Sequence, residues 1–453
     1  MHAFIQVAIL AAGVGKRMRS ALPKVLHSLG GRPLLAHVLA TVRTLEPQSI
    51  CVVYADDAVR KSFPDPDLKW ALQNPPNGTG DALAQALRVL ESDGVTLVLF
   101  GADPLASAIT LGKVIDCARA GALSLLTIEL DDPTGYGRIV RDERGKVVSI
   151  AEEKDASTRQ RAIREINTGV MAAPTDAFRR WLAKIDNKNS SGEYYLTDVI
   201  ALAVAEGAAV ATTRAENVME TLGVNSKRDL AELERLYQRA QAGALLDAGV
   251  TLADPARIDV RGQLTCGSDV SIDVGCIFEG EVSLADNVVI GAHCVIRNVS
   301  VGGGTFVAPF SHIEDAAIGA RCRVGPYARI RPGTLLGDEV HIGNFVEIKA
   351  SAIGVRSKVN HLAYVGDATV GRDVNVGAGT ITCNYDGANK HRTVIEDDVH
   401  IGSDTQLIAP VTVRQGATIG AGATISKEVP AGQLTISQNK QITIPGWKRP
   451  RKG

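Results

Sequence analysis

The sequence of 453 residues predicts two domains of different class, an α/β domain followed by a parallel β-helix. Three observations support this prediction. Short apolar runs alternate with amphipathic stretches in the first half, a charged stretch with helical spacing follows, and the second half repeats an aliphatic residue every six positions. A chain of this length has room for more than one domain.

The six-residue period is the most informative of these features. One run is Ile318, Val324, Ile330, Leu336, Ile342 and Ile348, and a second is Ile395, Ile401, Leu407, Val413, Ile419 and Ile425. A helix would place apolar residues three or four apart, and an ordinary strand would alternate them. A six-residue period is typical of a parallel β-helix, in which stacked coils bury one another's apolar sides.

The repeats run from about residue 251 to about residue 430 with one long interruption. The period slips by one residue near Ile353 and near Val370. Between Thr382 and Ile395 stands an extra segment, residues 383–392, that reads C-N-Y-D-G-A-N-K-H-R. Because an extended loop that leaves a regular scaffold usually carries function, we expect part of a site here.

The first half has the pattern of a Rossmann-like mixed sheet, mostly parallel. The expected strands are Val7–Leu10, Ile50–Tyr54, Leu97–Phe100, Leu123–Thr127 and Thr168–Ala172, and two of the expected helices are Pro33–Leu45 and Thr79–Leu90. Strands that alternate with helices predict a sheet covered by helices on both faces. Ligands bind such sheets at the carboxyl ends of the strands, so the site is expected there.

One long helix is expected between the two domains. Its apolar positions are Leu230, Leu233, Tyr237, Ala240 and Ala244, three or four residues apart among many charges. Gly249 suits the end of that helix. We therefore divide the chain into residues 1–225, a linker helix at 226–249, and residues 250–453, which end in a basic tail.

The amino-acid composition indicates which kinds of partner the protein does not bind and in which compartment it works. The chain has 49 basic and 50 acidic residues, so its charge predicts neither nucleic-acid binding nor an acidic-membrane partner. Its seven Cys are scattered without a C-x-x-C pair, which indicates reduced thiols in a cytoplasmic protein. The N-terminus lacks the features of a signal peptide, and no apolar run approaches the roughly 20 residues of a membrane span.

A glycine-rich segment follows the first expected strand. Residues 10–18 read L-A-A-G-V-G-K-R-M, and Pro23 and Lys24 come shortly after. Glycines allow backbone amides to approach a phosphate, and Arg17 and Lys24 supply positive charge. The spacing matches neither the dinucleotide fingerprint nor the Walker loop. An ordinary βα turn with two solvated cations is the alternative.

Further motifs accompany this segment. They are N-G-T-G-D-A at 77–82, D-P-T-G-Y-G-R at 132–138, A-E-E-K-D at 151–155, E-I-N-T-G at 165–169, G-E-Y-Y at 192–195 and G-V-N at 223–225. Together they resemble sugar-nucleotide pyrophosphorylases. Joined to a hexapeptide-repeat half, they resemble the bacterial family of bifunctional N-acetylglucosamine-1-phosphate uridyltransferases and glucosamine-1-phosphate N-acetyltransferases, which serves cell-wall synthesis. The resemblance covers essentially the whole chain and implies a left-handed β-helix.

For the N-terminal half, the resemblance implies uridylyl transfer from UTP to N-acetylglucosamine 1-phosphate, with release of pyrophosphate. Arg17 and Lys24 would neutralise phosphates, and Asn225 would ligate one Mg²⁺. The backbone and side chains that would hold the uridine nucleotide are Leu10, Ala11, Ala12, Gly13, Gln73, Gly78 and Thr79, and those that would hold the sugar are Gly137, Glu152, Asn167 and Tyr195. Such a reaction depends on positioning and charge neutralisation.

The second expected magnesium ligand is displaced in this chain. The family reads G-D-x-P-L after its third core strand, whereas residues 101–105 read G-A-D-P-L. In an extended segment, a one-residue step turns a side chain to the opposite face. We expect Asp103 to recover the ligand role by a bend of the loop. A cap on the following helix is the alternative role of Asp103.

For the C-terminal half, the resemblance implies acetylation of glucosamine 1-phosphate by acetyl-coenzyme A. His361 would act as the general base, since an imidazole with a near-neutral pKa suits an amine that loses a proton. Asn384 would orient His361 or the substrate amine. The expected substrate contacts are Arg331, Lys349, Tyr364, Asn375 and Lys390, and the expected coenzyme contacts are Ala378, Asn384, Tyr385, Ser403, Ala421 and Gln438. Gln438 stands where the family often has Arg.

Three other functions compete with this hypothesis. The first is a single-activity sugar-nucleotide pyrophosphorylase with a structural or regulatory β-helix, which the residues around His361 oppose. The second is a non-catalytic scaffold. The third is a three-histidine zinc site of the kind found in hexapeptide-repeat carbonic anhydrases. The resemblance also implies a homotrimer, a closed ring of three copies with acetyltransferase sites between subunits.

Overall fold

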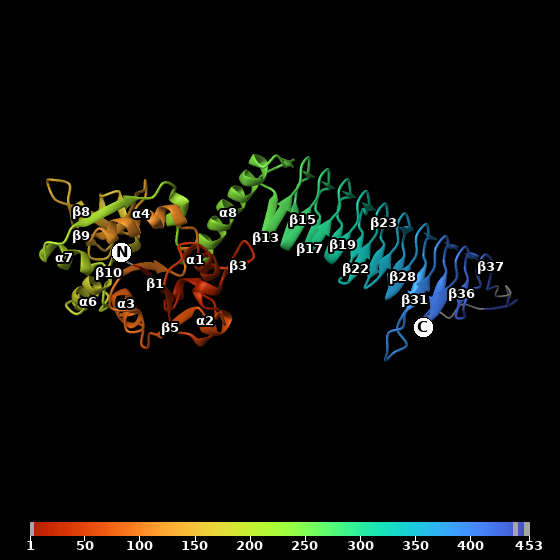
Figure 1. The fold of residues 1–453 in the computed structure, drawn as a ribbon, viewed down its shortest axis with the longest axis horizontal. Helices are drawn as coiled ribbons and strands as arrows, with labels where there is room; N and C mark the ends of the chain where they lie inside the picture. The colour runs from red at the N-terminus through yellow and green to blue at the C-terminus, as the bar shows by residue number, and fades with distance from the viewer. Residues whose placement is uncertain (1–3, 438–442, 448–453) are drawn as a thin grey trace. The chain divides into compact units, whose positions relative to one another are not determined.

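A nine-stranded mixed sheet forms the centre of the first of two units in this computed structural model, which describes residues 4–437 and 443–447 (Figure 1). The strand order is β11 (Val210–Arg214), β7 (Leu123–Glu129), β10 (Glu165–Pro174), β6 (Val95–Phe100), β1 (Ile5–Leu10), β4 (Ser49–Tyr54) and β5 (Leu68–Leu72). The hairpin of β8 (Gly137–Arg141) and β9 (Val147–Ala151) pairs with β10. The predicted mixed sheet is confirmed, because β10 runs antiparallel to β6 and β7 whereas β1 is parallel to β4 and β6.

Successive residues of the central strands point into different cores. Val7 and Ile9 of β1 belong to one apolar cluster, and Ala8 and Leu10 belong to another. The first core is covered by α1 (Leu34–Arg43) and α4 (Ala108–Arg119), and the second by α3 (Thr79–Leu87), α6 (Thr175–Leu182) and α7 (Asp198–Ala205). Because a strand buried on both faces must be apolar throughout, these strands appear in the sequence as continuous apolar runs.

Short elements complete this unit. They are η1 (Lys16–Met18), η2 (Lys24–Leu26), β2 (Ser28–Leu29), β3 (Arg32–Pro33), α2 (Asp57–Ser62), α5 (Thr158–Arg161) and η3 (Val218–Thr221). The glycine-rich segment leaves the carboxyl end of β1, and the segment that contains Asp103 leaves that of the neighbouring β6. The predicted phosphate and metal side chains therefore start from one edge of the sheet.

The predicted linker helix is α8 (Lys227–Asp247). Ser226 and Asp229 cap its start reciprocally, because the Asp229 amide donates to Ser226 Oγ and the Ser226 amide donates to Asp229 Oδ2. Gly249, at φ +90°, terminates the helix. The two compact units divide within α8, after Tyr237. Among the described residues, no helix has the length and apolarity that crossing a membrane requires.

The second unit is the predicted parallel β-helix, with three faces of short parallel strands. The first face contains β12 (Thr251–Leu252), β14 (Ser271–Ile272), β16 (Val289–Ile290), β18 (Phe306–Val307), β20 (Arg323–Val324), β23 (His341–Asn344), β26 (Lys358–His361), β29 (Asn375–Val376), β32 (His400–Ile401), β35 (Thr418–Ile419) and β37 (Leu434–Thr435). The second face contains β21 (Arg329–Ile330), β24 (Glu347–Lys349), β27 (Tyr364–Gly366), β30 (Ile381–Cys383), β33 (Gln406–Ile408) and β36 (Thr424–Ile425). The third face contains β22 (Thr334–Leu336), β25 (Ala352–Ile353), β28 (Ala368–Val370), β31 (Thr393–Ile395) and β34 (Val411–Val413). Four longer strands bend from the second face into the third: β13 (Ile258–Cys266), β15 (Cys276–Leu284), β17 (Val295–Val301) and β19 (His312–Ile318).

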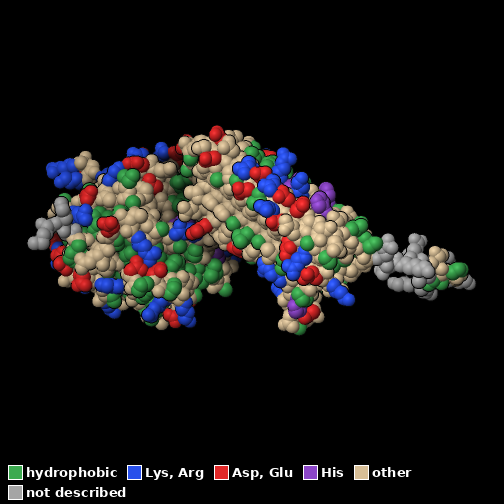
Figure 2. All heavy atoms as spheres, turned by 45° about the vertical axis from the view of Figure 1, so that its right-hand side comes forward, with side chains coloured by type: hydrophobic (Ala, Val, Ile, Leu, Met, Phe, Trp, Pro, Cys, Tyr) green, Lys and Arg blue, Asp and Glu red, His purple; other side chains and the backbone are tan. Residues whose placement is uncertain are grey.

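The six-residue period marks the residues that fill this β-helix. All twelve aliphatic residues of the two runs are buried in its core, together with Cys276, Cys294 and Cys322. Ion pairs such as Arg321–Glu339 and Arg356–Asp373 join successive coils, and Figure 2 shows basic and acidic side chains interleaved over the β-helix surface. The predicted extra segment is the loop between β30 and β31, which projects from the stack in Figure 1.

The corner between the first and second faces carries an aromatic column, formed by His293, Phe310, Tyr327 and Phe345. Consecutive rings stack with centroids 5.2, 5.0 and 5.2 Å apart. All four residues have φ between 54° and 60°, since the chain turns sharply at this corner. Leu362 continues the column one coil further, and Phe310, Tyr327, Phe345 and Leu362 are between 48 % and 64 % exposed.

Candidate functional sites

Two adjoining cavities at the carboxyl edge of the sheet collect the predicted N-terminal residues. The Gly-loop cavity contains Leu10, Ala11, Ala12, Gly13, Gln73, Gly78 and Thr79. The hairpin cavity contains Arg17, Asp103, Gly137, Glu152, Asn167, Tyr195 and Asn225. Lys24, Thr79, Phe100 and Glu193 line both cavities. Residues separated by more than 200 positions thus meet in one continuous hollow.

The Gly-loop cavity holds its polar groups in fixed orientations. The buried Gln73 donates from Nε2 to Gly78 O at 2.9 Å and to Asp81 Oδ2 at 2.7 Å. Its Oε1 therefore remains as the acceptor toward a ligand. Gly78 has φ +109°, and a side chain there would collide with the Tyr194 backbone. The Gly80 amide donates to Tyr194 O, which ties this loop to the segment of Tyr195.

The hairpin cavity derives its polar lining from β8, β9 and a bulge in β10. The pairing of β10 with β7 shifts register between Asn167 and Met171, and Asn167 Oδ1 accepts from the Gly169 amide at 3.1 Å. Glu152 accepts from Thr197 Oγ1 at 2.8 Å. Burial raises the pKa of Glu152, while the bond from Thr197 opposes the rise. The arrangement offers amide and carboxylate groups to the hydroxyls of a sugar.

Asp103 and Ala102 face different cavities, as the one-residue step predicts. Ala102 lines the Gly-loop cavity, and Asp103 lines the hairpin cavity with Asn225. The Asp103 carboxylate lies against Gly223, where it leaves no room for a side chain. The Val224 amide donates to Ala102 O at 3.0 Å, which holds the two segments together. The bend of the loop therefore returns the displaced carboxylate to the neighbourhood of Asn225.

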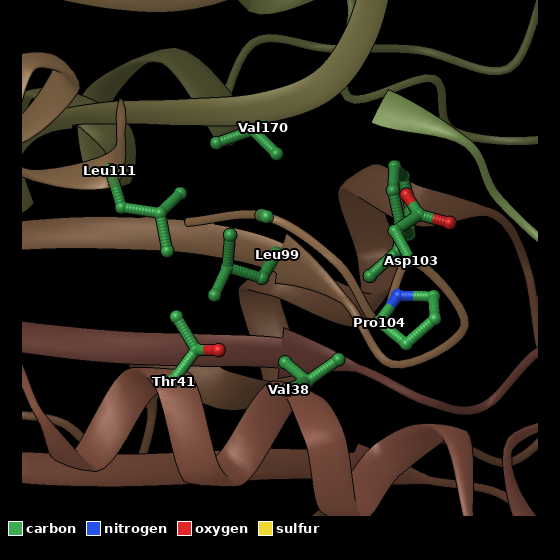
Figure 3. Close-up of a pocket in the computed structure, with 9 residues that line it drawn as sticks. Val38, Thr41, Leu99, Asp103, Pro104, Leu111 and Val170 are labelled. Atoms are coloured by element: carbon green, nitrogen blue, oxygen red, sulfur yellow. The ribbon is translucent and has the colours of Figure 1, made fainter. Parts of the chain in front are cut away.

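The surroundings of Asp103 are mostly apolar. Figure 3 shows it at one end of a small cavity whose other labelled walls are Val38, Thr41, Leu99, Pro104, Leu111 and Val170. Burial raises the pKa of Asp103 to about 7, and Lys24 opposes the rise. The alternative cap role of Asp103 is wrong, because Ser107 caps α4 and accepts from the Thr110 amide at 3.1 Å.

The donor set near Asn225 fits a hard divalent cation. Asp103 and Asn225 supply carboxylate and amide oxygens, which Mg²⁺ prefers, and the structure already places a cation on the Asn225 oxygen: Lys24 Nζ donates to Oδ1 at 3.1 Å. Asp229, which the sequence reading did not single out, lines the same cavity and accepts from the Asn225 amide at 2.9 Å. It fixes the turn that presents Asn225.

On the β-helix, the corner between the second and third faces brings together three expected cations. Arg331 pairs with Glu347 at 2.8 Å, and Lys349 pairs with Asp367 at 3.3 Å. Lys349 lowers the pKa of Lys390, and Arg331 acts in the same direction while Asp367 opposes both. Like charges held this close favour a multiply charged anion between them. Asn384 donates to Asp367 and to the Tyr364 hydroxyl, so it completes this cluster.

His361 lies at the corner between the first and second faces, and the expected coenzyme residues stack on it coil by coil. The Gly379 amide donates to His361 O, the Asp404 amide to Ala378 O and the Gly422 amide to Ser403 O. Hence His361, Ala378, Ser403 and Ala421 form one corner column, each one position before the place that would continue the aromatic column. Tyr385 is exposed in the projecting loop, and Gln438 lies outside the described residues.

Two contacts differ from the expectation for this half. The partner of His361 is Asn344, not Asn384: His361 Nδ1 and Asn344 Oδ1 are 3.0 Å apart. Since an amide oxygen only accepts, Nδ1 carries the proton and Nε2 carries the lone pair. Asn375 lies on the first face, opposite Lys358 and His400 in the strand register, and not on the second face with Arg331, Lys349 and Tyr364. One chain therefore does not gather all the expected substrate contacts.

The sequence reading missed Glu347, Asp367, Asn344 and Asp229. The first two lie 16 to 18 residues from the cations that they neutralise. This spacing is the length of one coil of the β-helix, so the repeat itself indicates which residues lie next to each other on neighbouring coils. Among the residues that the structure describes, no three His, Cys, Asp or Glu side chains of one chain gather around a possible metal position.

Comparison with known proteins agrees with both halves of the molecule. Residues 7–142 match the MobA-like NTP transferase domain, residues 260–353 match the GMPPB C-terminal domain, and residues 392–427 match six repeats of the bacterial transferase hexapeptide. The chain is 59 % identical to the bifunctional protein GlmU of Nitrosospira multiformis over 99 % of its own length and 98 % of the relative's. It is 60 % identical to those of Aromatoleum aromaticum and Azoarcus sp., over 99 % of the chain and 99 % and 100 % of the relatives.

Proposed function

The chain belongs to the GlmU family of bifunctional proteins, and on this premise we propose how its residues carry out two reactions. It is a bifunctional enzyme that produces UDP-N-acetylglucosamine. The C-terminal half transfers an acetyl group to glucosamine 1-phosphate, and the N-terminal half transfers a uridylyl group to the product. The co-substrates are acetyl-coenzyme A and UTP, both cytoplasmic metabolites, and we assign the enzyme to the cytoplasm.

In the N-terminal half, the phosphate of N-acetylglucosamine 1-phosphate attacks the α-phosphorus of UTP, and pyrophosphate leaves in line. Arg17 and Lys24 neutralise the phosphates, while Glu152, Asn167 and Tyr195 orient the sugar. Asp103 and Asn225 would hold one Mg²⁺, which when bound supplies positive charge to the phosphate oxygens. Gln73 reads the base: its free Oε1 accepts from the N3–H of uracil, whereas cytosine has an acceptor at that position.

In the C-terminal half, the amine of glucosamine 1-phosphate attacks the thioester carbonyl of acetyl-coenzyme A. His361 Nε2 takes the proton that the amine loses, and the tetrahedral intermediate expels the coenzyme thiolate, which recovers the proton. Asn344 holds the required tautomer through Nδ1. Arg331, Lys349 and Lys390 bind the sugar phosphate. The convergence of these three cations near Asp367 and Asn384 is the observation that carries the two-reaction proposal, because a merely structural β-helix has no use for it.

We assign the acetyltransferase sites to boundaries between copies of the chain. Asn375 lies around the corner from the other substrate contacts, so a second copy must present its first face to complete the site. The exposed aromatic column runs along the same corner up to Leu362, next to His361. A patch of this kind marks an interface. A closed homotrimer joins three such corners with three sites.

Replacing Tyr327 by Glu is expected to dissociate the trimer, because a charge at the centre of the column would be buried without a partner. Light scattering after size exclusion should report a monomer, with acetyl transfer lost and uridylyl transfer retained. Leu335→Glu is the matched control, because Leu335 is 58 % exposed on the third face, away from the column. A Tyr327→Glu chain that stays trimeric, or a wild type that is monomeric, contradicts the proposed interface.

Assays from which one substrate is left out test the proposed function itself. The chain with glucosamine 1-phosphate, acetyl-coenzyme A, UTP and MgCl₂ should form UDP-N-acetylglucosamine and release free coenzyme thiol and pyrophosphate. Without acetyl-coenzyme A no thiol is released, and UDP-N-acetylglucosamine and pyrophosphate should form only if N-acetylglucosamine 1-phosphate is supplied. Pyrophosphate release from N-acetylglucosamine 1-phosphate without any thiol release from glucosamine 1-phosphate would instead identify the single-activity pyrophosphorylase.

A further inference from the structure

Lys24 and Asn225 touch one another, although the proposed reaction gives them different partners. Lys24 Nζ donates to Asn225 Oδ1 at 3.1 Å. The reaction requires Lys24 on the nucleotide phosphates and the Asn225 oxygen on a divalent cation. A cation on the Asn225 oxygen would lie within a few ångström of the ammonium while the present contact persists, so we expect this contact to open during the catalytic cycle.

The charges around Lys24 are those that would attract a metal ion. Burial lowers the pKa of Lys24, and Arg17 adds to that effect, while Asp103 and Asp229 oppose it. The ammonium contacts the Asn225 oxygen directly, and the carboxylates of Asp103 and Asp229 line the same cavity. A divalent cation bound at the Asn225 oxygen would experience the same negative charges.

The stem of Lys24 permits the side chain to leave. Cβ of Lys24 packs against Gly15, where an added carbon would lie 3.0 Å away, so the base of the side chain is held by the Gly-rich segment. The residue lines both cavities. Rotation of the four-carbon stem can therefore carry the ammonium from Asn225 to the phosphate side without any movement of the backbone.

A divalent cation and the ammonium compete for the Asn225 oxygen. Mg²⁺ requires oxygen ligands at about 2.0–2.1 Å, which would set two or more positive charges within a few ångström of the ammonium. We propose that Lys24 is a built-in counter-cation that occupies the metal position until a nucleotide is bound, when the phosphates receive the ammonium and free Asn225. This inference rests on the proposed uridylyl-transfer site and adds to it an ordered coupling between nucleotide and metal.

The coupling makes an unusual prediction: loss of a residue from the site should strengthen metal binding. Lys24→Met keeps the stem and removes the charge. It is expected to bind Mn²⁺ alone, without nucleotide, about tenfold or more tightly than the wild type, within the usual range of coupling between ligands. Electron paramagnetic resonance of free Mn²⁺ measures this affinity without any catalytic turnover.

Matched variants separate the possible outcomes. Lys16→Met removes a neighbouring lysine that lines only the Gly-loop cavity, so the affinity for Mn²⁺ should not change. The double variant Lys24→Met/Asn225→Ala should lose the gain. Lys24→Gln repeats the test with a second neutral side chain, and melting curves verify that each variant is folded. If neither Lys24→Met nor Lys24→Gln binds Mn²⁺ more tightly than the wild type, the counter-cation role is overturned. If, in addition, Asn225→Ala does not change Mn²⁺ binding in the presence of UTP, the proposed metal site is wrong as well.

Discussion

His361→Ala is expected to lower the rate of acetyl transfer roughly 1,000-fold, the usual scale for loss of a general base, and to leave uridylyl transfer unchanged. Asn344 engages Nδ1, so Nε2 is the ring nitrogen that remains for the proposed proton transfer. The two rates are measured separately, as coenzyme thiol released from acetyl-coenzyme A and as pyrophosphate released from UTP.

His312→Ala is the matched control for that experiment. His312 is another exposed histidine of the β-helix, in the strand register opposite Val295 and Arg329, and no role is assigned to it. Its replacement should change neither rate. Acetyl transfer that survives in His361→Ala would remove the general base from the mechanism, and loss of both activities would argue against separate sites.

Asp103→Ala is expected to lower uridylyl transfer roughly 100- to 1,000-fold, because the variant leaves Asn225 as the single assigned protein ligand of Mg²⁺. Acetyl transfer should be unaffected. The rate of pyrophosphate release is measured as a function of MgCl₂ concentration, and the variant should require far more Mg²⁺ for half-maximal activity.

The double variant Ala102→Asp/Asp103→Ala tests whether the carboxylate alone matters. It moves the acid back to the position that the family uses, in the wall of the Gly-loop cavity beside the shared Lys24. We expect most of the lost activity to return. A fully active Asp103→Ala chain would show that Asp103 does not hold the metal, and a double variant as slow as Asp103→Ala would show that the loop of this chain does not support a carboxylate at the position that the family uses.

The β-helix was predictable from the sequence because each coil repeats the same short pattern of buried residues. Each coil must fill the same interior, so Ile318, Val324 and Ile330 recur at the six-residue period and are buried as predicted. The core strands β1, β4 and β6 were predictable for a similar reason, since burial on both faces leaves a continuous apolar run. The reversal of β10 was not predictable, because its direction depends on pairings with β6 and β7 that no local pattern encodes.

The sequence singled out residues that the structure gathers into the candidate sites, but it did not predict how these residues pair. The partners of His361, Lys349 and Asn384 are Asn344 and Asp367, which lie on neighbouring coils 17 or 18 residues away. Coil stacking creates these contacts, and their only signal in the sequence is the spacing of one coil, which the motifs themselves do not contain. For Asp103, sequence alternation correctly separates it from Ala102, but the approach to Asn225 depends on the bond between Val224 and Ala102 O.

The capped start of α8 limits where this gene could be divided into two. Asp229 holds the Asn225 turn, and further along the same helix Glu234 accepts from the Gly30 amide while the Tyr237 ring packs on Gly30. A chain break at the apparent boundary after residue 225 would therefore remove the α8 residues that hold the uridylyl-transfer site in place. Natural or engineered separation into two enzymes is confined to breaks beyond Tyr237, and any exchange of the N-terminal half between relatives must carry the first half of α8 with it.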